Sequence, residues 1–146
     1  MKNKSENKFK IPNKENVEAV LLFLPYFCNP KNEFYKVIDT KKGKDGIYTL
    51  GYESYNEGTS RFYECLHNEN FMQPFAWSEW QGEAFKYMVN HDMLLNGDII
   101  TLVKLFTLII RKDRFCEGFF TSRIDDGFIL DMLLRLQEIY NETWNK

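Results

Sequence analysis

The sequence lacks the short motifs that identify common catalytic and nucleotide-binding sites. Its 146 residues contain no G-x-x-x-x-G-K-[ST], G-x-G-x-x-G, H-E-x-x-H or G-x-S-x-G. Phosphate loops, dinucleotide sites, zinc-protease helices and serine nucleophile elbows depend on those spacings. No enzyme class is therefore indicated, and the sequence favours a protein that is not an enzyme.

Cysteine and histidine are also scarce. The three cysteines, Cys28, Cys65 and Cys116, are widely spaced and form no C-x-x-C, and there are two histidines, His67 and His91. An odd, scattered set excludes a disulfide framework and matches no recognised zinc spacing. We expect no metal and no cofactor, and the reduced thiols predict a cytoplasmic protein.

No apolar run is long enough to cross a membrane. The longest covers residues 99–110, with Lys104 as its only charge, whereas a spanning helix needs roughly 20 residues. Residues 20–27 follow several lysines but contain Pro25, and no small-residue cleavage site comes after them, so they do not form a secretory signal. The sequence therefore predicts no membrane partner.

Charge is distributed unevenly between the N-terminus and the rest of the chain. Residues 1–14 contain five lysines against Glu6, which gives them a charge of +4. Because the net charge of the whole chain is −2, the remaining residues carry a charge of −6. We expect residues 1–13 to form a disordered basic tail. An acidic remainder disfavours nucleic acid as a partner, because a nucleic-acid surface needs clustered cations.

The segment of residues 98–118 organises the predicted fold. A helix that is apolar on nearly every side must be surrounded by other parts of the protein. Asp98 is suited to be its N-cap and Gly118 to adopt a left-handed conformation at its end. The sequence thus predicts a buried central helix, enclosed by the first, third and last helices.

The remaining pattern predicts a mainly α (α+β) fold, with residues 14–146 as a single helical domain and one β-hairpin. The hairpin would pair residues 34–38 with 47–50, and one of its faces should lie on the helices because a lone hairpin is marginal in water. Ser78 and Gln81 fit a capping box, and Asp131 and Arg135 are spaced as an i, i+4 pair. We predict helices over residues 15–27, 59–68 (starting as early as 54), 78–91, 119–125 and 128–144.

Several stretches resemble one protein family. They are L-P-Y-F, P-F-A-W-S-E-W-Q-G-E-A, L-V-K-L-F-T-L-I-I-R-K-D-R-F-C-E-G-F-F and D-G-F-I-L-D-M-L-L-R-L. Together they are similar to an uncharacterised prokaryotic family, the domain of unknown function numbered 6508, from about residue 17 onward. The resemblance implies a small intracellular protein and transfers no catalytic residue.

The polar end of the central helix carries the candidate site. Arg111 and Arg114 are three residues apart and share a helix face, and Arg114 can reach Glu117. One interpretation is an internal network, in which Arg111 or Arg114 pairs with Glu79 or Glu83 beside Trp77 or Trp80. The other is that the arginines form a fork for a carboxylate or phosphate.

Three classes of function remain open from the sequence. The favoured class is a small cytoplasmic, non-enzymatic interaction or regulatory module, with a protein partner at the hairpin or at residues 77–83. The second is a small enzyme or binder of an anionic ligand at Arg111, Arg114 and Glu117. The third is a nucleic-acid accessory protein that uses the basic tail, and the sequence does not determine the oligomeric state.

Overall fold

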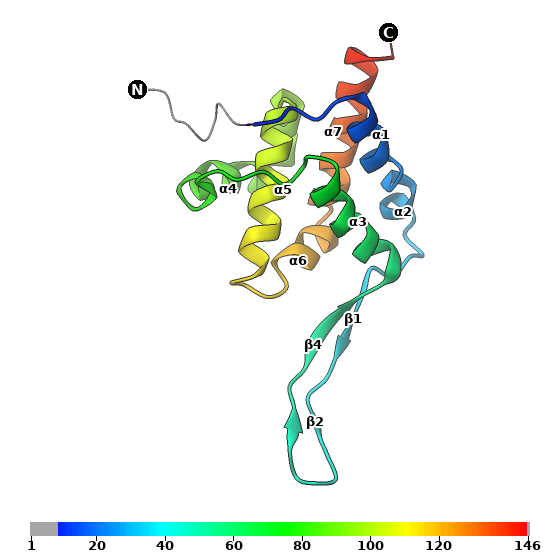
Figure 1. The fold of residues 1–146 in the computed structure, drawn as a ribbon, viewed down its shortest axis with the longest axis vertical. Coiled ribbons are helices and arrows are strands. Elements are labelled where there is room, and N and C mark those ends of the chain that lie inside the picture. Colours follow the sequence, from blue (N-terminus) through cyan, green and yellow to red (C-terminus); the bar gives the residue numbers. More distant parts are fainter. Residues whose placement is uncertain (1–8, 146) are drawn as a thin grey trace.

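Helices form the body of the protein, and a long two-stranded arm projects from it (Figure 1). The computed structural model describes residues 9–145. The helices are α1 (Lys14–Leu21), α2 (Leu24–Cys28), α3 (Glu57–Asn68), α4 (Gln81–Val89), α5 (Ile99–Asp113), α6 (Phe119–Asp125) and α7 (Phe128–Thr143), with 3-10 helices η2 (Trp77–Trp80) and η3 (His91–Asn96). This mainly helical architecture with one hairpin confirms the predicted fold class.

Helix α5 is the buried centre of the body. Its N-cap Asp98 accepts a hydrogen bond from the Thr101 amide at 2.9 Å, as the sequence predicted. Leu105 is 0% exposed, and a continuous set of its neighbours is also buried. The helices η2, α4, α6 and α7 pack around α5, and α3 reaches it through the rings of Phe62 and Phe106. The first helix packs chiefly on α3 and α7 instead.

The predicted first helix is divided in two. Asn13 and Asn16 form a capping box at the start of α1, with hydrogen bonds of 2.9 and 3.0 Å. The chain then turns at Leu22 and Phe23 before α2 begins. Pro25 lies in the first turn of α2, where its missing N–H costs no helical hydrogen bond. Pro25 therefore lies at the start of the second of these two helices.

Residues 9–13 lie against the body. The Lys10 amide donates to Gln73 Oε1 at 2.6 Å, and the rings of Phe9 and Phe75 have centroids 5.8 Å apart. This part of the predicted disordered tail is therefore ordered by packing. Residues 1–8 lie outside the described residues.

The arm consists of strands β1 (Tyr35–Ile38) and β4 (Tyr52–Tyr55), continued by β2 (Lys41–Lys42) and β3 (Tyr48–Thr49). The register of β1 and β4 is antiparallel, with Tyr35 opposite Tyr55 and Ile38 opposite Tyr52. The predicted pairing of residues 34–38 with 47–50 is thus wrong, because the hairpin is longer and its partner strand is β4. Residues 54–55, the earliest predicted start of the next helix, are still strand.

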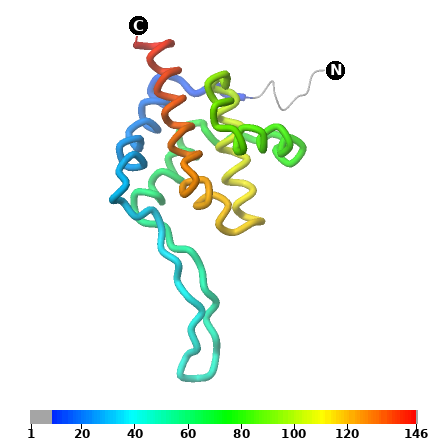
Figure 2. Tube along the Cα trace, turned by 180° about the vertical axis from the view of Figure 1, so that it is seen from behind, coloured from blue at the N-terminus to red at the C-terminus, as the bar shows by residue number. Residues whose placement is uncertain are grey.

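The expected contact of a hairpin face with the helices is limited to the base of the arm. Tyr35 donates to Asp125 at 2.6 Å, and Thr121 donates to Glu53 at 2.7 Å. Beyond this base the arm stands away from the body, as the view from behind also shows (Figure 2). The prediction that one face lies on the helices is therefore wrong for the outer part of the arm.

Two predicted side-chain contacts are also replaced. Gln81 Nε2 donates to the Ser78 carbonyl, so this pair stabilises the 3-10 turn η2 and is not a capping box. Asp131 lies 2.6 Å from His91 Nδ1 rather than pairing with Arg135, whose Nε donates to the Gly97 carbonyl. For Asp131 and Arg135, the segment of residues 91–97 offers partners that the helical spacing alone did not reveal.

Candidate functional site: a pocket at the end of α5

The last turns of α5 form one wall of a pocket of about 370 Å³. Thr107, Arg111 and Arg114 occupy positions i, i+4 and i+7, so they follow one another along a single helix face. Thr107 is 1% exposed, and its hydroxyl donates to the Phe71 carbonyl and accepts from the Gln73 amide. The threonine fixes the inner end of the wall, and the two arginines form its outer part.

Three aromatic side chains and Pro74 form the rest of the pocket lining. Trp77 in η2 stacks on Phe115 in the turn after α5, with centroids 6.1 Å apart and planes at 29°. Phe75 lines the pocket between them and the N-terminal segment. Phe115 is 78% exposed, which leaves much of its ring open to solvent. The pocket thus combines cationic and flat apolar surfaces.

The arginines are not neutralised by an internal ion pair. Within residues 9–145, no carboxylate lies at salt-bridge distance from either guanidinium group. Glu83 instead accepts from Lys86 Nζ at 3.0 Å. Lys86 is one turn along the same helix, so it reaches Glu83 without any approach between helices. The network predicted between the arginines and Glu79 or Glu83 is therefore not formed.

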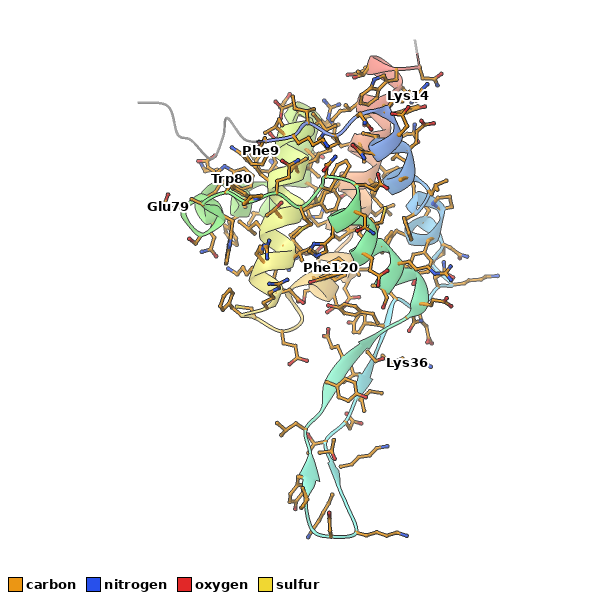
Figure 3. All side chains as sticks on the ribbon, in the orientation of Figure 1. Phe9, Lys14, Lys36, Glu79, Trp80 and Phe120 are labelled. Carbon is orange, nitrogen blue, oxygen red and sulfur yellow. The ribbon has the colours of Figure 1, made fainter. Side chains whose placement is uncertain are left out.

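The other predicted site residues lie outside the pocket. Glu79 projects from the edge of the body at η2 (Figure 3). Trp80 faces Phe75 and Tyr87, with centroid distances of 6.0 and 6.4 Å. Glu117 is exposed in the turn between α5 and α6, since α5 ends at Asp113. Of the seven predicted residues, the structure brings together Trp77, Arg111 and Arg114.

The arginines create a positive potential that extends to α3. The pKa of His67 is lowered, first by desolvation and then by the charges of Arg111 and Arg114. A neighbouring cation disfavours the protonated ring, because like charges repel. His67 therefore reports on the charge state of the pocket without lining it.

Four residues of this region were missed by sequence reasoning. Phe75 and Thr107 look like ordinary core positions, and His67 lies in a different helix. Phe115 offered one signal, because a large aromatic residue in the polar turn R-K-D-R-F-C-E-G has no apolar neighbour to cover it. Only the fold places these residues next to the arginines.

Outside this pocket, the described residues contain a close histidine–aspartate pair but no cluster of metal ligands. Among the described residues, no three or more His, Cys, Asp or Glu side chains are grouped as a metal site. His91 and Asp131 form a close pair, and the His91 ring packs edge-on against Phe128, with 5.0 Å between the ring centroids.

Within residues 9–145, no helix is both long enough and apolar enough to span a membrane.

Comparison with known proteins identifies the family of the chain. No curated protein and no solved structure matches it. The match to a sequence family extends over residues 12–142, which includes the arm, the pocket and all of the helices up to the last turn of α7. The chain belongs to the Family of unknown function (DUF6508).

Proposed function

We propose that the protein is a non-enzymatic binding module that takes up a small anion with a flat apolar part in the pocket at the end of α5. The observation that carries this proposal is the pair Arg111 and Arg114. Their guanidinium groups line a pocket of about 370 Å³, and no carboxylate of residues 9–145 pairs with them. A carboxylate or phosphate of the ligand would supply the missing counter-charge.

The two surfaces of the pocket suit two parts of one ligand. Guanidinium groups present several N–H donors in a plane, which matches the oxygens of a carboxylate or phosphate. The Trp77–Phe115 stack provides a flat face for an aromatic ring. Stacking of this kind contributes about 0.5–1.5 kcal/mol beyond area burial. A ligand that carries both groups should therefore bind better than either part alone.

Binding, rather than catalysis, is the role that the lining residues support. Among the described residues that line it, the polar groups are the side chains of Thr107, Arg111 and Arg114 and the indole N–H of Trp77. The Thr107 hydroxyl is already hydrogen-bonded and buried, and arginine stays protonated at neutral pH. The lining thus offers no nucleophile with an adjacent base and no group that exchanges protons near pH 7.

The test uses the full chain with benzoate, phenyl phosphate, inorganic phosphate and uncharged benzyl alcohol as probes. At about 100 times its dissociation constant, a bound ligand adds about 2.7 kcal/mol of stability. For a chain of this size that raises Tm by about 5–10 °C. We expect benzoate or phenyl phosphate to reach this shift, inorganic phosphate to give less and benzyl alcohol to give none.

Matched arginine variants decide whether the pocket is responsible. Arg114→Ala should abolish the shift, while Arg61→Ala, which removes an exposed arginine paired with Glu57 on α3, should leave it intact. Binding should also raise the pKa of His67, followed by NMR, because the ligand's charge offsets that of the arginines. No shift with any anionic probe, or equal loss in both variants, contradicts the proposal.

A second candidate function, a protein-interaction module, is favoured by the exposed arm.

A cytoplasmic location is part of the same proposals and is supported by Cys28, Cys65 and Cys116, which are all free thiols. Nucleic-acid binding through the basic N-terminus remains the weakest candidate. Retention on DNA or RNA that disappears when residues 1–14 are removed would favour it over the other two.

A further inference from the structure

The outer arm, residues 37–52, exposes large apolar side chains that the body does not cover. Five of them are more than half exposed: Val37 65%, Ile47 66%, Tyr48 63%, Leu50 79% and Tyr52 52%. Isolated apolar residues are common on protein surfaces, but a cluster on one projecting element marks an interaction site. The arm therefore has the composition of a surface that is covered in an assembly.

The backbone of the arm is also incompletely paired. Strand β1 pairs with β4 alone, so its other edge has open N–H and C=O groups. A two-stranded ribbon is marginal in water, and three or more strands are needed for independent stability. An open edge is also a template for a strand of another chain. Addition of a strand at β1 would pair the open backbone groups, and it would place side chains of the added strand beside the apolar side chains of the arm.

A groove lies beside this open edge at the base of the arm. It has a volume of about 730 Å³ and is lined by residues 32–38 together with Asp125. Its wall includes the carboxylates of Glu33 and Asp125 and one cation, Lys36, which is labelled in Figure 3. The lining of the groove therefore has a net charge of −1, and it also includes apolar side chains such as Phe34.

The tip of the arm has the opposite charge. Residues 41–49 contain Lys41, Lys42 and Lys44 against Asp45, which gives +2. If two arms pair side by side in opposite directions, the tip of each lies at the base of the other. That arrangement places the lysines at the tip of each arm next to the carboxylates at the base of the other arm. A two-fold axis relates the two copies, so this contact is made twice.

We propose that the arm is a dimerisation element whose occupant is a second copy of this chain. The β1 edges of the two copies lie antiparallel, and the basic, apolar tip of each arm enters the acidic groove at the base of the other. Two-fold closed dimers are the commonest protein assembly, and their interfaces use one patch on both subunits. This inference does not depend on the pocket at the end of α5.

The test is the oligomeric state of the full chain, measured by sedimentation velocity and light scattering over a concentration series. The wild type should form a dimer. Lys41→Glu and Glu33→Lys should each raise the dimer dissociation constant about tenfold, because each puts like charges together. The combination of both substitutions should restore affinity to within about threefold of wild type, since the opposite charges face each other again.

Two further variants make the result specific. Lys14→Glu, the same charge change at an exposed position on α1, should leave the dimer unchanged. Leu50→Asp should give a monomer that keeps the wild-type circular-dichroism spectrum, because Leu50 does not contribute to the core. A wild type that stays monomeric overturns the proposal, and so does a dimer that is unaffected by the Lys41, Glu33 and Leu50 variants.

Discussion

Leu105 and Leu50 occupy opposite environments in the same chain. Leu105 lies at the centre of α5 and is 0% exposed, whereas Leu50 lies on the outer arm and is 79% exposed. Both belong to short apolar segments, and hydropathy alone would bury both. The body buries its apolar side chains because several helices converge on α5. The arm cannot, because a two-stranded ribbon has no second layer to pack against.

The comparison shows that the two regions depend on different interactions. The stability of the body comes from burial of apolar surface and from caps at its helix ends. Polar contacts hold the arm at its base, and one of them is the hydrogen bond from Tyr35 to Asp125. This hydrogen bond raises the pKa of Tyr35 to about 12. Substitutions should therefore have large effects in the body and small effects on folding in the outer arm.

The largest expected difference is between two leucine truncations. Leu105→Ala should lower the free energy of unfolding by about 2–5 kcal/mol, from lost packing and the cavity left behind. At a protein concentration low enough for the chain to be monomeric, Leu50→Ala should change it by less than about 0.5 kcal/mol, as for other exposed positions. Urea denaturation of both variants measures the difference. A cost below about 1 kcal/mol for Leu105→Ala would show that α5 is not the core.

A smaller difference is expected between two aspartates. Asp113 accepts hydrogen bonds from the Phe120 amide at the start of α6 and from the Tyr55 hydroxyl at the base of the arm. Asp113→Ala should cost about 1–3 kcal/mol, because it leaves both donors unpaired. Asp45 also accepts from an amide, that of Ile47, but in the exposed turn of the arm.

Asp45→Ala provides the control for this prediction and should cost less than about 0.5 kcal/mol. Thermal unfolding of the two variants under identical conditions compares them. Equal losses would mean that the turn of the arm is as important for folding as the junction between α5 and α6.

The smallest expected effect is a difference in thiol reactivity. Burial, and then the charge of Glu69, raise the pKa of Cys65 to about 11. At pH 8 only about one Cys65 thiol in a thousand is then ionised, and the thiolate is the reactive form. Cys28 and Cys116 are exposed. A disulfide reagent should therefore label two thiols rapidly and Cys65 at least about tenfold more slowly.

Single-cysteine variants identify which thiol belongs to each phase of this reaction. Urea should abolish the difference, because it removes the burial around Cys65. Rapid labelling of Cys65 in the native protein would mean that α3 opens locally and often.

Much of the helical body could be predicted from the sequence because its signals are local. The Asp98 cap, the apolar content of α5 and the range of α6 each depend on residues that are close in the chain. The left-handed Gly118 was also foreseen, although it begins α6 rather than ending α5. The prediction missed the true partner strand of β1, because a hairpin with a long connection allows more than one pairing.

The candidate site could be predicted only in part. That Arg111 and Arg114 share a face follows from helix geometry. The predicted pairing of these arginines with Glu83 was wrong, because Glu83 has a closer cation, Lys86, on its own helix. Phe75 and Trp77, which complete the pocket, precede the arginines by more than 30 residues. No local pattern relates these two segments.

The sequence by itself determined that residues 99–110 form a helix hidden from water, because their side chains offer almost no polar face and Asp98 accepts a hydrogen bond from the Thr101 amide in the first turn. Only the tertiary structure decided that the end of this helix faces Trp77 and Phe115, and that the arm extends beyond the body. Caps and apolar periodicity act over a few residues. The position of one segment against another depends on how all of the helices pack together.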